Sequence, residues 1–170
     1  MSRRTFPART LLAATLATLG LAVLVATIFA PTEVERVYGE TKIAIAAIQT
    51  GASGALPHVT LGVSGDETEL DRCDGTFTEM VHYQQPGTVP TWAAHNNCGG
   101  DVILSWEVGQ QLSIDGTTYA VVDVRMLPKR VATSEDLLGM HGELTLQTCL
   151  YGQQMMKFVG VEKVAAAASR

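Results

Sequence analysis

Residues 11–30 form an uncharged apolar run, LLAATLATLGLAVLVATIFA. A helix needs about 20 apolar residues to cross the hydrocarbon core of a bilayer, so this run has the length of a membrane span. It must therefore be considered apart from the rest of the 170-residue chain. The remainder, about 140 residues, is enough for one domain with a single core and too short for two ordinary domains.

The flanks of the apolar run predict its orientation. Residues 1–10 carry three arginines and no acidic residue, and basic residues beside a span stay in the cytoplasm. A cleaved signal peptide has a shorter apolar region and small residues just before the cut, whereas here Ile28 occupies one of those positions ahead of a cut after Ala30. We therefore expect an uncleaved signal anchor at 11–30 rather than a removed leader, with a cytoplasmic N-terminus and an exported C-terminal domain.

The exported part is acidic. After the first ten residues the chain carries nine basic residues against seventeen acidic ones, a net charge of −8. Binding to nucleic acid requires a basic face that neutralises phosphates, so we expect no nucleic-acid partner. No long run of one charge sign predicts a second membrane contact beyond the anchor.

The chain has three cysteines, and an odd number in an oxidising compartment leaves one unpaired after one disulfide has formed. Three pairings are open. Cys73 in LDRCDG and Cys98 in HNNCGG stand in polar, Gly-rich sequences, whereas Cys149 in ELTLQTCLYG stands in an alternating stretch that is typical of a strand. We predict a Cys73–Cys98 disulfide and a free thiol at Cys149. The alternative for Cys149 is a small buried core residue, which is where free cysteines usually lie.

Short segments with strand patterns follow one another along the exported part. They are bounded by Gly, Pro, Ser, Asn and Asp, and Asp115-Gly116 is a hairpin signal. Seven or eight short strands without regular helical segments predict an all-β fold, a mostly antiparallel barrel or sandwich. The segments are 59–63, 77–85, 102–108, 111–115, 118–127, 143–150 and 155–163, with 41–49 as an eighth that has a helical alternative.

Other segments are expected to connect or flank these strands. Residues 31–54 are expected to be an extracellular linker with a first strand region, in which 31–40 either extends the anchor helix or acts as a spacer. The segment 131–142 predicts a short helix or turn, because Ser134-Glu135-Asp136 precedes an apolar pair. The C-terminal residues 163–170 are expected to form a disordered tail.

A nucleophilic thiol needs a partner that exchanges its proton and a donor that stabilises the oxyanion formed on attack at a carbonyl. The four histidines, His58, His82, His95 and His141, supply candidates, although each alone is typical of a solvated surface residue. His95 stands out because it opens the loop HNNCGGD. A disulfide at Cys98 would hold that loop, and with it the imidazole, in place.

The segment TLQTC, ending at Cys149, resembles the TLxTC signature of sortases, the membrane-anchored cysteine transpeptidases of Gram-positive cell surfaces. The sequence AHNN, with its His 54 residues before that Cys, and the strand pair that follows it are similar to the family's layout. The resemblance covers about residues 55–162 and agrees with an N-terminal anchor. It implies an eight-stranded closed β-barrel as the catalytic domain.

The resemblance also implies a reaction. Cys149 would attack the Thr–Gly bond of a C-terminal sorting signal on a secreted protein and form a thioacyl enzyme. An amine from a cell-wall precursor or a pilin lysine would then resolve it. His95 would protonate the leaving amine and accept a proton from the incoming one. Thr148 would help to position the substrate backbone, whereas Thr145 and Leu146 would be packing residues.

The chain departs from the family at one catalytic position. Sortases carry an Arg on the strand after the Cys, and here that strand reads MMKFV and contains no Arg. Lys157 is the candidate replacement, although an ammonium lacks the planar fork of a guanidinium. Gln153 and Gln154 are candidate neutral donors at the preceding turn, and Trp92 is a candidate wall of the substrate groove. An exported binding domain that is non-catalytic or hydrolytic is therefore the alternative.

No cofactor is expected. The acidic segment 66–74 offers hard oxygen ligands, and the resemblance allows calcium there. It lacks any Ca-loop pattern, so a solvated loop without a metal is the favoured prediction.

Overall fold

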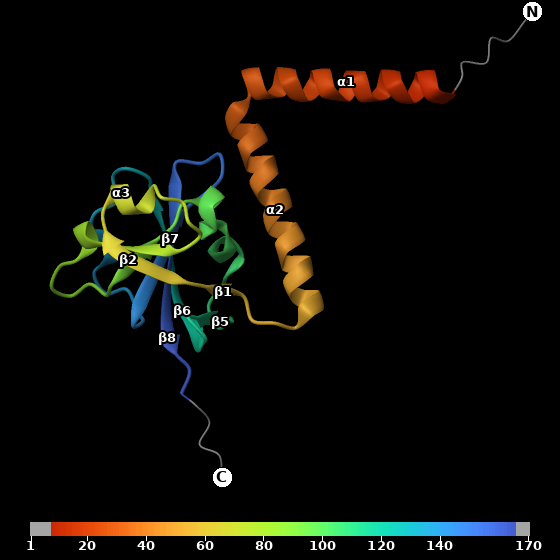
Figure 1. Cartoon of the computed structure of the whole chain (residues 1–170). Helices are drawn as coiled ribbons and strands as arrows, with labels where there is room; N and C mark the ends of the chain where they lie inside the picture. Colours follow the sequence, from red (N-terminus) through yellow and green to blue (C-terminus); the bar gives the residue numbers. More distant parts are fainter. Residues whose placement is uncertain (1–7, 166–170) are drawn as a thin grey trace, which may run out of the picture.

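The computed structural model describes residues 8–165 (Figure 1). Two helices lead into a β-domain. Helix α1 covers Ala8–Phe29 and α2 covers Pro31–Ser53, and the two meet at a sharp bend. Ala30 has φ −140° and ψ 55°, outside the helical region, because proline disfavours a helical conformation in the residue before it. Most of residues 1–10 and most of the predicted tail at 163–170 lie outside the described residues.

Helix α1 contains a window, Leu12–Phe29, with a mean hydropathy of 2.3 and no buried residue. It is the one described helix that is long and apolar enough to cross a membrane. The expectation of a first strand region within residues 31–54 is wrong, because residues 41–49 are helical throughout and belong to α2. Alanines favour a helix, and Gly39, Lys42 and Ile43 share the inner face at helical spacing.

The β-domain contains eight strands in one sheet, in the order β1-β5-β6-β8-β7-β4-β3-β2. Their bounds are β1 His58–Val59, β2 Leu61–Gly65, β3 Phe77–Met80, β4 Thr91–Ala93, β5 Gln111–Ile114, β6 Thr117–Pro128, β7 Leu144–Cys149 and β8 Met155–Lys163. The short helical segments are α3 Glu67–Leu70, η1 Val81–Tyr83, η2 Asn96–Cys98, η3 Gly100–Ser105 and η4 Ser134–Leu137. The expected all-β class and the count of about eight strands are confirmed.

The sheet closes almost completely on itself. Strands β1 and β2 occupy its two ends, yet only Thr60 separates them in the chain. Strand β1 pairs with β5 and β2 pairs with β3, and the Thr60 carbonyl accepts a hydrogen bond from the Phe77 N–H at 2.9 Å. One continuous segment therefore joins both ends, which leaves little open edge.

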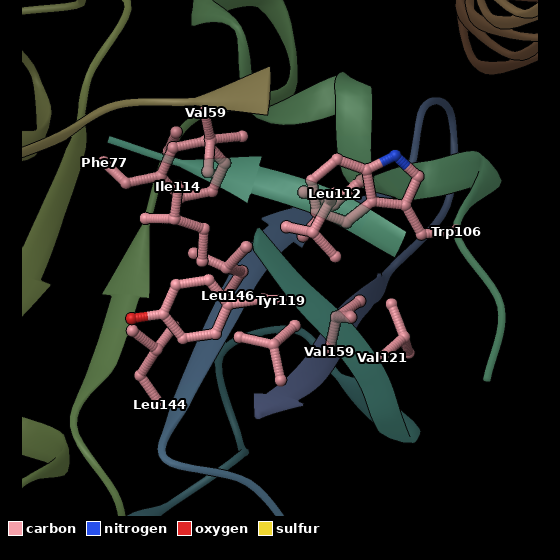
Figure 2. Packing of buried hydrophobic residues seen from close by; sticks show 13 residues of the cluster. Val59, Phe77, Trp106, Leu112, Ile114, Tyr119, Val121, Leu144, Leu146 and Val159 are labelled. Carbon is pink, nitrogen blue, oxygen red and sulfur yellow. The ribbon is translucent and has the colours of Figure 1, made fainter. Parts of the chain in front are cut away.

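Two apolar clusters lie on opposite faces of the central strands. The barrel interior holds one cluster, which includes Trp106, Leu146 and Val159 (Figure 2). The outer face holds the other, which consists of Met80, Tyr83, Ala93, Leu137, Met140, Met156 and Phe158 with Cys149 packed against it. Because side chains alternate along a strand, Leu146 points into the barrel and Cys149 points outward.

Two expected strands are partly or wholly helical. Segment 102–108 mainly forms η3, in which Ile103 and Trp106 are buried three residues apart, the spacing of one 3₁₀ turn. Segment 77–85 is a strand only as far as Met80 and continues as η1. The other predicted strands are present, and η4 lies in the predicted 131–142 segment with a capping box between Thr133 and Asp136.

Candidate active site

The parallel pairing of β4 with β7 places the two candidate catalytic residues at the same end of neighbouring strands. Thr91 pairs with Thr145 and Ala93 pairs with Gln147, and the Ala94 N–H donates to the Gln147 carbonyl at 3.1 Å. Since the strands are parallel, His95 and Cys149 each lie two residues beyond the paired residues Ala93 and Gln147. His95, just after β4, and Cys149, the last residue of β7, therefore lie at the same end of this strand pair.

Thr148 locks this register. Its hydroxyl is fully buried and donates to the Ala94 carbonyl at 2.8 Å. Gly100 makes room for the contact, because a Cβ there would lie 2.5 Å from the Thr148 Oγ1 and would also collide with the Ala94 carbonyl. Thr148 thus fixes the position of the backbone at Ala94, the residue before His95. Its predicted role toward the substrate stays a prediction.

Cys149 ends β7 with a half-buried side chain. It is a free thiol, as predicted. The thiol packs against the outer cluster rather than in the barrel interior, so it lies where a nucleophile can be reached from outside the barrel.

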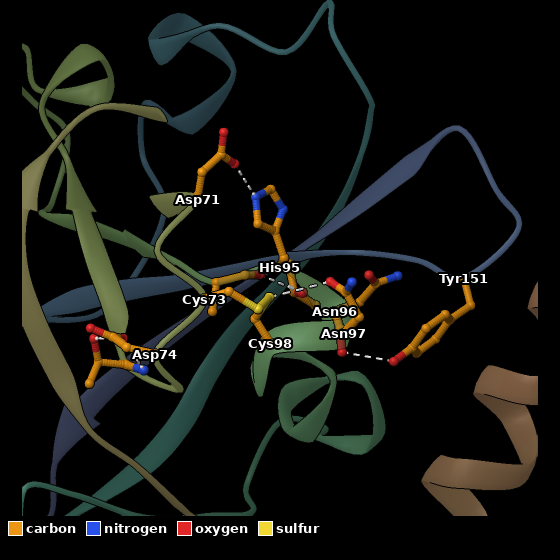
Figure 3. Close-up of a disulfide and its surroundings, with 11 residues drawn as sticks. Asp71, Cys73, Asp74, His95, Asn96, Asn97, Cys98 and Tyr151 are labelled. Atoms are coloured by element: carbon orange, nitrogen blue, oxygen red, sulfur yellow. Dashed lines mark hydrogen bonds and ion pairs between the residues drawn. A yellow bond between two sulfur atoms is a disulfide. The ribbon is translucent and has the colours of Figure 1, made fainter. Parts of the chain in front are cut away.

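His95 follows β4 and precedes η2 (Figure 3). Its Nε2 lies 2.8 Å from the Asp71 Oδ1, so with a protonated Nε2 the imidazole donates to this carboxylate and presents Nδ1 as the second nitrogen. The two side chains are 38% and 72% exposed, and such exposed pairs contribute little to stability. The contact therefore matters for the orientation of the imidazole.

The predicted Cys73–Cys98 disulfide is present, with a Cα–Cα distance of 5.0 Å. Asp71 lies two residues before Cys73, and His95 lies three residues before Cys98. The disulfide therefore holds the segment that carries Asp71 against the loop that carries His95.

The structure does not bring Lys157 to Cys149. Lys157 pairs with Thr148 across β7 and β8, on the face opposite to Cys149. Its ammonium donates to the carbonyls of Leu104 and Trp106 at 3.0 and 2.5 Å, and burial lowers its pKa. This placement corrects the expectation that Lys157 replaces the missing Arg, because its charge anchors η3 to the barrel.

Arg125 lies on the same face as Cys149, since it pairs with Phe158, which pairs with Gln147. Its guanidinium donates to the carbonyls of Asp136 and Leu138, each at 3.0 Å, and to the Asp123 carboxylate at 3.4 Å. This guanidinium therefore holds the connection that carries η4 over the outer face.

The other two predicted positioning residues lie apart from each other. Gln154 is exposed in the turn between β7 and β8, where its carbonyl accepts the Lys129 N–H at 2.9 Å. Trp92 is half-buried and packs against the interior cluster, so its ring faces the barrel rather than the outer face of Cys149.

Tyr151 connects the loop of His95 to the turn after Cys149 and to α2. Its hydroxyl lies 2.8 Å from the Asn96 carbonyl (Figure 3). It also lies 3.2 Å from the Asp101 Oδ2, and the same carboxylate lies 2.6 Å from the Lys42 Nζ. Burial, with repulsion from Asp101, raises the pKa of Tyr151 to about 12. The phenol therefore stays protonated and can donate at neutral pH.

Helix α2 docks closely on this tyrosine. A Cβ at Gly39 would collide with the Tyr151 ring, and Tyr38 meets the same ring edge-on at 5.9 Å between centroids. A cavity of about 330 Å³ lies along α2 and η3, lined by residues such as Ile43, Ala47 and Trp106, and neither Cys149 nor His95 lines it.

The carboxylates of segment 66–74 have protein partners. Asp66 caps α3, and its pKa is lowered by the hydrogen bond from the Thr68 backbone. Asp74 accepts from Thr76, which lowers its pKa. Within residues 8–165 no group of three or more His, Cys, Asp or Glu side chains could hold a metal ion. Calcium binding stays untested.

Sequence reasoning does not identify Asp71 and Tyr151, which contact His95 and its loop, or Tyr83 of the outer cluster. The sequence contains an indication for Asp71, because the predicted Cys73–Cys98 disulfide places the segment of Asp71 beside the HNNC segment that begins with His95. Tyr83 and Tyr151 have none, since neither stands at a motif position and their partners are distant in the chain.

No protein-family model and no curated protein matches the chain. Solved structures of sortases are among those to which the chain is similar. The pilus island 1 sortase C1 of GBS has 17% identity and a TM-score of 0.46, over 65% of this chain and 61% of that one. Streptococcus suis sortase C1 has 17% identity and a TM-score of 0.44, over 62% of this chain and 65% of that one. The Clostridium perfringens sortase D5 transpeptidase has 13% identity and a TM-score of 0.40, over 61% of this chain and 70% of that one. The chain thus matches less than two thirds of the length of the first two.

Proposed function

We propose that this chain is a membrane-anchored cysteine transpeptidase of the sortase type. The observation that supports the proposal is the parallel register of β4 and β7, in which His95 follows β4 at the end of the strand pair where β7 ends at the free thiol of Cys149. The TLQTC signature supports it, as does the apolar helix α1, which would hold the domain at a membrane.

The reaction would run in two halves. The Cys149 thiol passes its proton to His95, the sulfur attacks the carbonyl carbon of a Thr–Gly bond, and the carbonyl electron pair moves to oxygen. Collapse of this intermediate breaks the C–N bond, and His95 gives its proton to the leaving amine. An amine then attacks the thioester, passes a proton to His95 and releases the Cys149 sulfur, with a new amide as the product.

The test is turnover of a quenched-fluorescent peptide library with a central Thr–Gly bond by the full-length chain in detergent, with mass analysis of the enzyme. We expect an acyl adduct on Cys149. The Cys149→Ala variant should fold normally and form no adduct. Thr145→Val is the matched control in the same strand and should retain turnover. Turnover by Cys149→Ala would refute the mechanism.

A second candidate is an exported binding domain without chemistry. The hydrogen bonds of Lys157 and Arg125 favour it, because Lys157 lies on the face opposite to Cys149 and Arg125 already donates to the carbonyls of Asp136 and Leu138. A hydrolase is a variant of the first proposal. Oligoglycine discriminates among the three functions, since a transpeptidase forms a glycine-extended product, a hydrolase releases a free carboxylate and a binding domain yields neither.

The proposed orientation has the N-terminus in the cytoplasm and the β-domain outside, where secreted substrates and amine acceptors of the cell wall would meet it. Protease treatment of intact spheroplasts tests this orientation. External protease should digest the β-domain, whereas protection of the β-domain until lysis would reverse the topology.

A further inference from the structure

Tyr83 ends η1 and places its ring on the outer cluster. The residue is 7% exposed, and its ring meets Phe158 edge-on, with centroids 5.9 Å apart and planes at 88°. The His82 ring lies on it at 4.2 Å. The ring is therefore fixed between η1 and β8.

The same ring lies over the part of the sheet that carries the candidate nucleophile. Phe158 pairs with Gln147, and Cys149, two residues further on the same face, pairs with Met156. Tyr83, Met156, Phe158 and Cys149 all belong to the outer cluster. Tyr83 and Cys149 therefore share one packed surface, although they are 66 residues apart in the chain.

The hydroxyl of Tyr83 is free to act as a donor. Buried phenols usually find a hydrogen-bond partner, yet within residues 8–165 none accepts from or donates to this hydroxyl, and the hydroxyl is not fully enclosed. Burial, followed by repulsion from Cys149 and more weakly from Glu67 and Asp136, raises the pKa of Tyr83. The phenol therefore stays protonated on the surface that it shares with the thiol.

We propose that the Tyr83 hydroxyl is the donor that stabilises the oxyanion formed when Cys149 attacks a carbonyl. This inference rests on the proposed acyl-transfer function. As the C–S bond forms and the carbonyl electron pair moves to oxygen, the Tyr83 O–H donates a hydrogen bond to that oxygen without losing its proton. It thereby fills the role for which the sequence suggested Lys157. Loss of one such donor typically slows acyl transfer by about a hundredfold to a thousandfold.

The test uses an acyl donor that needs no peptide recognition. The full-length chain in detergent is mixed with p-nitrophenyl acetate, and the burst of p-nitrophenol reports acylation of Cys149, with Cys149→Ala as the blank. Tyr83→Phe keeps the ring and removes the hydroxyl. Tyr119→Phe is the matched control, because Tyr119 is also 7% exposed but packs in the barrel interior. Alkylation of Cys149 by iodoacetamide, which forms no oxyanion, reports the thiol itself.

We expect Tyr83→Phe to slow the burst about a hundredfold to a thousandfold, with alkylation unchanged and with Tyr119→Phe like the wild type. An unchanged burst overturns the inference, and so does an equal loss in burst and alkylation, which would mean that Tyr83 acts on the thiol. A wild-type burst without turnover of any Thr–Gly peptide would overturn the peptide activity alone. No wild-type burst would overturn both.

Discussion

The Thr148 hydroxyl donates to the Ala94 carbonyl at 2.8 Å, so the residue before the candidate nucleophile is tied to the residue before the candidate base. The bond is fully buried and spans 54 residues of sequence. It closes a parallel pairing of only three residue pairs. A short pairing has few ladder bonds, so one side-chain bond contributes noticeably to its register.

Thr148→Val is expected to destabilise the domain and to slow acylation of Cys149. The change keeps the side-chain shape but leaves the buried Ala94 carbonyl without its donor, which costs about 1–3 kcal/mol. The measurement is urea unfolding in mild detergent, followed by near-UV circular dichroism, together with the burst rate.

Thr145→Val is the matched control for this prediction. Thr145 lies in the same strand with no exposed surface, and its Oγ1 has no hydrogen-bond partner among residues 8–165. Removing a hydroxyl that is already unpaired should leave stability equal or higher. If both substitutions lowered the free energy of unfolding by the same amount, the Thr148 hydrogen bond would not be what holds the register of β4 and β7.

The disulfide is expected to contribute both to stability and to the geometry of His95. It joins residues 25 apart, and a loop of that length is stabilised by about 3 kcal/mol in the chain-entropy description. Reduction with dithiothreitol should therefore lower the free energy of unfolding by about this amount. It should also slow peptide turnover, because Asp71 is then no longer held at the imidazole.

The double variant Cys73→Ser/Cys98→Ser separates this effect from other actions of the reductant. Without any reductant, the variant should have the lower free energy of unfolding and the slower peptide turnover of the reduced wild type. Dithiothreitol should change neither quantity further. A wild-type protein whose stability and turnover are unaffected by reduction would contradict the prediction.

Gly39→Ala and Gly51→Ala test the docking of α2. Both glycines lie in this helix, where alanine is favoured by about 1 kcal/mol. A Cβ at Gly51 meets nothing within 4 Å, whereas one at Gly39 collides with the Tyr151 ring. Gly51→Ala should therefore stabilise the helix, and Gly39→Ala should loosen it from the barrel, with a cost of about 1–3 kcal/mol from overpacking.

Limited trypsin digestion measures this docking at Lys42, whose ammonium pairs with Asp101 when α2 is in place. Faster cleavage is expected for Gly39→Ala and slower or unchanged cleavage for Gly51→Ala. The opposite order would mean that α2 does not rest on Tyr151 in solution.

The contribution of Tyr151 to stability should depend on pH above neutrality. Its pKa is raised from 10.0 to about 12 in the folded state, mainly by burial and then by repulsion from Asp101. The unfolded chain therefore releases this proton first as the pH rises. The stabilisation by the neutral phenol is complete below pH 10 and is lost between pH 10 and 12.

Tyr151→Phe removes that contribution together with the part of the raised Lys42 pKa that comes from Tyr151. The difference in the free energy of unfolding between wild type and variant should be constant at lower pH and should shrink as the pH passes 10. A difference that is independent of pH would show that the Tyr151 phenol is not shielded in the folded protein.

The sequence by itself determined the features that depend on neighbouring residues. The uncharged run at 11–30 identifies a helix long enough for a membrane, and alternation with Asp115-Gly116 predicts the hairpin of β5 and β6. The turn contexts of Cys73 and Cys98 identify the disulfide, which leaves Cys149 as the free thiol. Each of these features depends on the composition of a short segment or on the alternation of apolar and polar residues along it.

Only the tertiary structure decided which groups surround Cys149. The sequence places Lys157 on the strand after the nucleophile, but pairing of β8 with β7 turns its ammonium to the other face, toward η3. Asp71 meets His95, and Tyr83 packs on the same outer cluster as Cys149, through contacts between segments far apart in the chain. The physical reason is that strand register and loop closure set the face and the partner of each side chain, and both depend on contacts between residues far apart in the chain.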